Sequence, residues 1–228
     1  MAVTARTDIK PHPSQPTALF TPVFILGWLV NLTQYLSFYF LITVMALYAM
    51  ESFAVSETAG GFAASSFVIG ATVARVFAGW AADRFGKKQI LLIFVGLGTV
   101  ASLFYIPAAS LPALVAVRFV HGFSYSLAST AVMALVQSVI PASRRAEGTG
   151  YFALGSTLAT AFGPAIALFV IDDFNYNTLF WITTATSVFG LILTVLIRKP
   201  AVIKNAEHGR VKPVWSINTV VHPSLMLI

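Results

Sequence analysis

The sequence predicts an all-α integral membrane protein, built as a bundle of six transmembrane helices. Of the 228 residues, 57% are hydrophobic and only 10% are charged, and the mean hydropathy is +0.83. A soluble domain of this length cannot hide so much apolar surface. Asp, Glu, Lys and Arg are also missing from six long runs of the chain, each near the roughly 20 residues that a helix needs to cross a bilayer.

These uncharged runs place the predicted spans in order along the chain. The first run is too long for one perpendicular helix and too short for two spans with a turn, so we expect a single tilted or protruding helix. The runs are continuous rather than alternating, which argues against a membrane β-barrel. The expected spans are residues 22–47, 59–80, 89–106, 112–139, 148–169 and 178–197.

The orientation follows from the distribution of Lys and Arg, which favour cytoplasmic loops. The segments before span one and after spans two, four and six hold all the cations outside the spans, whereas the three opposite segments hold none. Both termini are therefore expected in the cytoplasm, with the protein in the cell (inner) membrane. The net charge of +6 is explained by topology, so we expect no nucleic-acid partner.

Other chemistries find little support in the residues. The chain has no cysteine, which excludes a thiolate metal site, and it shows no zinc-ligand spacing or Gly-rich phosphate loop. No metal or cofactor is expected, apart from the proton as a coupling ion. The first apolar run is too long for a secretory signal and has no small-residue cleavage site, so it is interpreted as an uncleaved span.

The segment GWAADRFGKK, between spans two and three, resembles the corresponding loop of the major facilitator superfamily. The family pattern is Gly, three residues, Asp, Arg, one residue, Gly and two basic residues. The resemblance implies a transporter whose two halves are latched at the inside face by this loop. The simpler alternative is a turn that only sets topology. Arg75 lies on the same helical face as Gly79 and joins the set, unless it only reaches for the membrane surface. The residues concerned are Arg75, Gly79, Asp83, Arg84, Gly86, Lys87 and Lys88.

The fourth span carries RFVHGFSYS, which resembles the fourth-helix motif of the same family. An arginine costs at least about 2.5 to 3.5 kcal/mol inside a membrane, so Arg118 is expected to face a protein or water-lined cavity. The resemblance places Arg118 in a proton-coupling position, with His121 and Tyr125 on nearly the same face. The alternatives are that Arg118 extends to the outer headgroups and that His121 only bonds a neighbouring helix.

The fifth span carries GYFALGSTLATAFGPAIA, which resembles the motif of the drug:proton antiporter branch. Gly155, Ala159 and Gly163 stand four residues apart and form a small-residue seam for another helix, and Pro164 bends the helix. The motif suggests efflux, although ordinary helix packing explains the same residues.

The first span offers Asn31, Gln34, Tyr35 and Phe38 on one face, a mixture of amides and aromatic rings suited to amphiphilic organic molecules. It offers no carboxylate for a proton. Three possibilities stay open: His121 carries the proton, an acid in a further half carries it, or transport is not proton-coupled.

A superfamily member normally has twelve spans, so the resemblance implies an amino-terminal half whose carboxy-terminal six-span partner is missing here. We expect a cytoplasmic tail at 1–18, a six-span bundle of two inverted three-helix repeats at 19–199, and a basic connector with the start of a seventh span at 200–228. The predicted function is secondary transport of small organic solutes in the lipid bilayer, by alternating access. The alternatives are a non-transporting half-size protein or partner subunit and, remotely, an intramembrane hydrolase; we do not expect an enzyme.

Overall fold

The computed structural model describes residues 18–198, which form long α-helices joined by short turns. The all-α fold is confirmed, and each expected span corresponds to one helix. The boundaries are α1 Pro22–Phe53, α2 Glu57–Phe85, α3 Lys87–Leu103, α4 Leu111–Gln137, the 3-10 turn η1 Ala142–Arg144, α5 Arg145–Asp173 and α6 Tyr176–Leu196.

Five of these helices are long and apolar enough to cross a membrane. α1 has 32 residues and is one continuous helix of roughly 48 Å, longer than the roughly 30 Å hydrocarbon core, as the length of its uncharged run led us to expect. α3 is the exception, since its 17 residues span only about 26 Å. Residues 104–106, expected in this span, lie in the turn that follows it.

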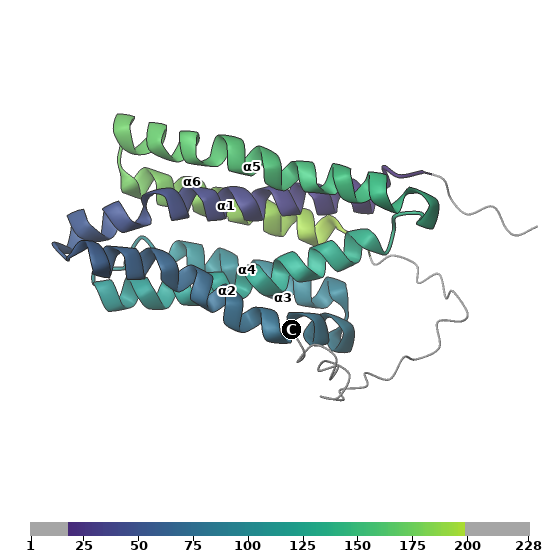
Figure 1. Cartoon of the computed structure of the whole chain (residues 1–228), viewed down its shortest axis with the longest axis horizontal. Coiled ribbons are helices and arrows are strands. Elements are labelled where there is room, and N and C mark those ends of the chain that lie inside the picture. Colours follow the sequence, from purple (N-terminus) through teal and green to yellow (C-terminus); the bar gives the residue numbers. More distant parts are fainter. Residues whose placement is uncertain (1–17, 199–228) are drawn as a thin grey trace, which may run out of the picture.

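The helices run up and down through the bundle, so their ends gather in two groups (Figure 1). One group holds the start of α1, the α2–α3 turn, the α4–α5 turn and the end of α6. We call it the basic end, because it carries Arg84, Lys87, Lys88, Arg144, Arg145 and Arg198. The side of the membrane that this end faces remains a prediction.

Local sequence sets where the helices begin and end. The side chains of Thr21, Ser56, Ser110 and Asn175 each accept a hydrogen bond from a backbone N–H of the first turn of α1, α2, α4 and α6. Between α2 and α3 the chain turns at Gly86, whose φ of +92° suits glycine. The last turn of α2 closes there, as the Gly86 N–H donates to the Ala82 carbonyl.

Helix contacts agree with two inverted repeats, the first made of α1, α2 and α3 and the second of α4, α5 and α6. In this arrangement α1 is equivalent to α4, α2 to α5 and α3 to α6. The extensive contact between α1 and α5 is then equivalent to that between α4 and α2, and the contact between α1 and α6 to that between α4 and α3. Both members of each pair are present, and α3 packs against α6 across the centre. α1 starts at the basic end and α4 at the opposite end, so the repeats run in opposite directions.

Glycines bring α2 and α4 into backbone contact. A methyl group added at Gly122 would collide with the Phe67 carbonyl, and one added at Gly70 would collide with the Phe119 carbonyl. Small residues at such positions let membrane helices approach closely. The two helices therefore meet without intervening side chains, which fixes the position of Phe67 against α4.

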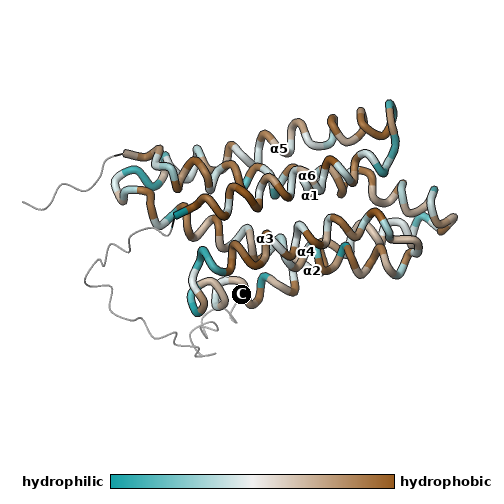
Figure 2. Tube along the Cα trace, turned by 180° about the vertical axis from the view of Figure 1, so that it is seen from behind, coloured by the Kyte–Doolittle hydropathy of each residue, from teal (hydrophilic) through white to brown (hydrophobic). Residues whose placement is uncertain are grey.

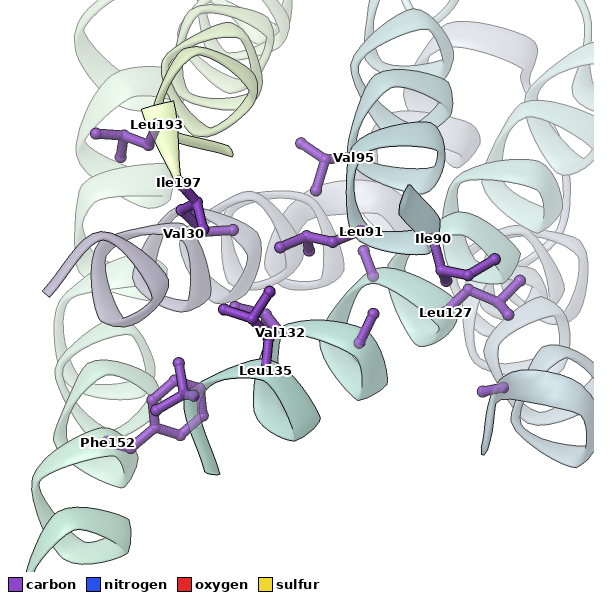
Figure 3. Close-up of a cluster of buried hydrophobic side chains, with 14 of the residues drawn as sticks. Val30, Ile90, Leu91, Val95, Leu127, Val132, Leu135, Phe152, Leu193 and Ile197 are labelled. Atoms are coloured by element: carbon purple, nitrogen blue, oxygen red, sulfur yellow. The ribbon is translucent and has the colours of Figure 1, made fainter. Parts of the chain in front are cut away.

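The described core is apolar and lies between the helices, whereas large apolar side chains also cover the outside. Figure 3 shows the largest cluster, toward the basic end, where Val30, Leu91, Leu135 and Leu193 meet from four helices. On the outside, Val76 and Trp80 of α2 are 77% and 63% exposed. Hydrophilic residues gather at the helix ends and turns (Figure 2). This distribution is typical of a protein embedded in a lipid bilayer.

The expected six-span segment, 19–199, encloses the helices described here. The expected tail and the expected connector with its seventh span lie almost wholly outside the described residues. These borders remain predictions.

Candidate functional site

Two hollows lie near the middle of the bundle, the first between α1, α2 and α4 and the second between α1, α4 and α5. The first has a volume of about 210 Å³. The second has a volume of about 410 Å³ and joins α1 and α4 to α5. The first is lined by Phe38, Phe67, Val68, Ala71, Thr72, Arg75 and Tyr125, and the second by Asn31, Tyr35, Ser129, Thr130, Met133, Ala134 and Phe152.

Aromatic rings join the two hollows. Tyr35 of the second contacts Tyr125 of the first edge to face, with ring centroids 5.8 Å apart. Phe38 stacks on Tyr125 at 5.7 Å, and Phe67 lies 5.1 Å from Phe38 and 5.4 Å from Tyr125. The hollows therefore belong to one wall of aromatic, amide and hydroxyl groups, which can hold molecules with both apolar and polar parts.

The first-span residues divide between those that line a hollow and one that does not. Asn31, Tyr35 and Phe38 line the hollows, with Asn31 buried and the two rings half-buried. Gln34 is buried and lines neither hollow. No Asp or Glu lines either hollow, so the described wall has no carboxylate.

Arg118 lies behind the wall. Its side chain is fully buried, so extension to the headgroups is excluded in this structure. One terminal nitrogen donates to the Ala64 carbonyl at 2.9 Å, and the guanidinium carbon lies 4.9 Å from the centre of the Phe67 ring. The Nε and Nη1 atoms have no hydrogen-bond partner among the described residues. A buried cation with unsatisfied donors is expensive, and a functional role for Arg118 remains a prediction.

His121 also lies behind the wall. Its Nδ1 is 3.1 Å from the Tyr105 hydroxyl, and its ring meets Phe67 edge to face. Nearby, Ser124 donates to the Val120 carbonyl within its own helix. Within residues 18–198, no hydrogen bond joins His121 to a serine, so nothing here supports the intramembrane hydrolase.

The loop motif lies at the basic end. A methyl group added at Gly79 would meet no atom within 4 Å, so this helix face is open, and Asp83 and Arg84 are exposed. Lys87 and Lys88 begin α3 and are half-buried. The one ion pair in the described part of the chain is elsewhere, between Arg144 and Glu147. The role of the motif as an inside gate remains a prediction.

Arg75 separates from the loop motif in space. It lines the first hollow with Phe38 and Tyr125, on the wall rather than at the basic end. From the sequence we assigned Arg75 to the loop motif and did not identify Phe67, although a pattern in the sequence links the two residues. Phe67, Ala71 and Arg75 recur every four residues and so share one helical face.

The antiporter-type motif forms the contact between α5 and α1. Gly155 faces Trp28 and Asn31, and a methyl group at Gly163 would lie 2.6 Å from Cβ of Tyr39. Ala159 is fully buried, and Pro164 lies inside α5. The seam expected of these residues is confirmed, whereas a role in antiport remains a prediction.

Comparison with known proteins decides the family. The sequence model of the Major Facilitator Superfamily matches residues 27–227. The chain belongs to the major facilitator superfamily. The transporter YwfA of Bacillus subtilis, an uncharacterized member, is 31% identical over 180 residues, which cover 78% of this chain and 42% of that protein. The multidrug resistance protein Stp of Mycobacterium tuberculosis is 27% identical over 146 residues, covering 64% of this chain and 27% of that protein.

Solved structures of this superfamily share the fold. A crystal structure of the peptide transporter POT matches with a TM-score of 0.72 at 17% identity, over 77% of this chain and 37% of that one. The chain spans less than half the length of these relatives. It is therefore a multi-pass membrane protein of a transporter family, comparable to one part of its relatives.

Proposed function

We propose that this superfamily chain forms one half of a secondary transporter that exports small organic solutes across the cell membrane by alternating access. The observation that carries the proposal is the wall of Asn31, Tyr35, Phe38 and Tyr125 near the middle of the bundle. A polar and aromatic surface at this depth costs stability unless it faces water, solute or protein. A second six-span half would close the hollows into a central site.

The proposed orientation places the basic end in the cytoplasm, since Arg84, Lys87, Lys88 and Arg145 lie there and cations favour the cytoplasmic side. Export is supported by the motif at Gly163 and Pro164 and by the name of the relative Stp. The acid that a proton-coupled exporter needs is expected in the further half, because no carboxylate lines the described wall.

The decisive experiment is transport by the complete product of the gene that encodes this chain. Everted membrane vesicles, whose cytoplasmic face is outside, receive fluorescent amphiphilic solutes in the external medium under an imposed pH gradient, with and without a protonophore, and uptake into the lumen is measured. We expect gradient-dependent flux that falls in Tyr35→Ala, because an aromatic face of the wall is lost. Arg145→Gln is the matched control, since its exposed side chain lies at the basic end away from the hollows. Absence of flux for every solute class would overturn the proposal and favour a non-transporting protein.

A further inference from the structure

Arg75 is a charged residue deep within a membrane helix. It lies ten residues before the end of α2 at Phe85, which is roughly 15 Å along the axis. It is exposed, and it borders the first hollow with Phe38, Thr72 and Tyr125. An arginine this far from the helix end has a large cost in hydrocarbon unless a partner or a polar cavity receives it.

No described acid is placed to pair with Arg75. Within residues 18–198 the acidic side chains lie near helix ends, and none lines the first hollow. Their positions are Glu51 and Glu57 at the α1–α2 turn, Asp83 toward the end of α2, Glu147 in the first turn of α5, and Asp172 and Asp173 in its last turn.

A second cation adds to the charge around this hollow. Arg118 contacts the Phe67 ring, and Phe67 is part of the hollow's lining. The hollow therefore has one cation on its rim and another behind its aromatic wall. A negatively charged ligand group is favoured in this hollow, because the two arginines lie beside a low-dielectric surface and no carboxylate of the lining compensates their charge.

The remaining lining is aromatic. Phe38, Phe67 and Tyr125 contact one another with centroid distances of 5.1 to 5.7 Å. Such rings can pack against the flat or hydrophobic part of a ligand that lies next to the Arg75 guanidinium. The chemistry that matches this arrangement is an amphiphile with an anionic head.

We propose that the hollow at Arg75 binds the anionic group of an amphiphilic organic substrate, and that Phe38 and Tyr125 hold its apolar part. This inference rests on the proposed transport function and narrows its substrate class to organic anions. It also gives Arg75 a role in substrate binding in place of a role in the loop gate.

The binding test uses the chain in nanodiscs of zwitterionic lipid and three probes that differ mainly in charge: 1-naphthoate, 1-naphthamide and 1-naphthylmethylammonium. Fluorescence anisotropy gives each affinity, with empty nanodiscs as the blank for partition into lipid. We expect 1-naphthoate to bind about tenfold more tightly than 1-naphthamide, as for a hydrogen bond to a charged group. The ammonium probe should bind most weakly.

Variants separate the charge from the apolar surface. Arg75→Gln should remove the preference for 1-naphthoate while retaining binding of 1-naphthamide, which also shows that the variant is folded. Arg75→Lys should keep part of the preference, and Arg145→Gln should keep all of it. Phe38→Ala should weaken all three probes by a similar factor. Equal affinities for the three probes, or an unchanged preference in Arg75→Gln, would overturn the proposal.

A transport measurement distinguishes failure of this site from failure of the proposed function. In the complete gene product, 1-naphthoate should compete with the transported solute in the wild type and not in Arg75→Gln. Flux without any charge preference would overturn the proposed anion site and would still support the proposed transport function. Binding of 1-naphthoate by the chain without competition in the complete product would show that the hollow at Arg75 does not receive transported anions, which also overturns the proposal.

Discussion

The Tyr105 hydroxyl lies 3.1 Å from Nδ1 of His121, in a buried contact between the α3–α4 turn and α4. Tyr105 is fully buried and His121 is 4% exposed. The Phe67 ring meets the imidazole edge to face, with centroids 5.4 Å apart, and neither hollow includes His121. The histidine is therefore held as part of the packing between helices.

A structural role for His121 is the first prediction. His121→Gln and Tyr105→Phe should each lower the free energy of unfolding by about 1 kcal/mol, because each disrupts the buried contact between the Tyr105 hydroxyl and the His121 imidazole. Thermal unfolding in detergent measures this loss. Proton-driven flux should retain its pH dependence in His121→Gln. Loss of that dependence in His121→Gln alone, with Tyr105→Phe normal, would instead assign the proton to His121.

Close contact between α2 and α4 gives the second prediction. Gly122→Ala should lower the free energy of unfolding by about 1 to 3 kcal/mol or prevent folding, because its methyl group meets the Phe67 backbone. Gly79→Ala on the same pair of helices has open space and should leave stability unchanged or slightly higher. Equal unfolding midpoints for the two variants would contradict the packing described here.

The α1–α5 seam gives the third prediction. Gly163→Ala places a methyl group 2.6 Å from Cβ of Tyr39, so the helices must separate and the unfolding midpoint should fall. Gly150→Ala in the same helix meets nothing within 4 Å and serves as the control. Size-exclusion profiles and thermal unfolding measure both variants. A neutral Gly163→Ala would mean that α1 and α5 are not in close contact.

Much of the fold could be predicted because membrane insertion is dominated by long uncharged runs, which the sequence displays directly. The predicted 22–47 and the observed α1, Pro22–Phe53, share their start because Thr21 and Pro22 form a clear helix beginning. The helix continues to Phe53 because no Gly or Pro stands between Leu47 and Phe53, and it ends where Ala54 takes a left-handed conformation. Helix length beyond the bilayer leaves no mark in hydropathy.

The site was harder to predict because facing residues come from different helices. Tyr125 could be assigned to the wall from its own helix, whereas the role of Phe67 depends on the glycine contact that fixes α2 against α4. Arg75 was grouped with Asp83 because both fall on one helical face. A single face extends over the whole length of a helix, so it does not fix depth in the membrane.

The loop motif gives the fourth prediction. Asp83 is exposed at the basic end and has no described ion-pair partner, so Asp83→Asn should change the free energy of unfolding of this chain by no more than about 0.5 kcal/mol. Transport by the complete product should nevertheless fall strongly if the motif latches two halves. Glu57→Gln, an exposed acid at the opposite end, is the control for loss of one surface charge. Equal flux in Asp83→Asn and Glu57→Gln would reduce the motif to a turn that sets topology.

The last prediction concerns replacement of Arg118. Its buried charge is expected to lower the stability of the fold and to be needed for transport. The guanidinium keeps one hydrogen bond and one ring contact but leaves Nε and Nη1 without described partners. Arg118→Met fills much of the same space without these buried donors, so its unfolding midpoint should equal or exceed that of the wild type. Arg118→Ala leaves a cavity and should be less stable by about 2 kcal/mol or more. Both variants should lose transport if the charge takes part in the cycle. A transport-competent Arg118→Met would show that this costly arginine serves neither stability nor transport.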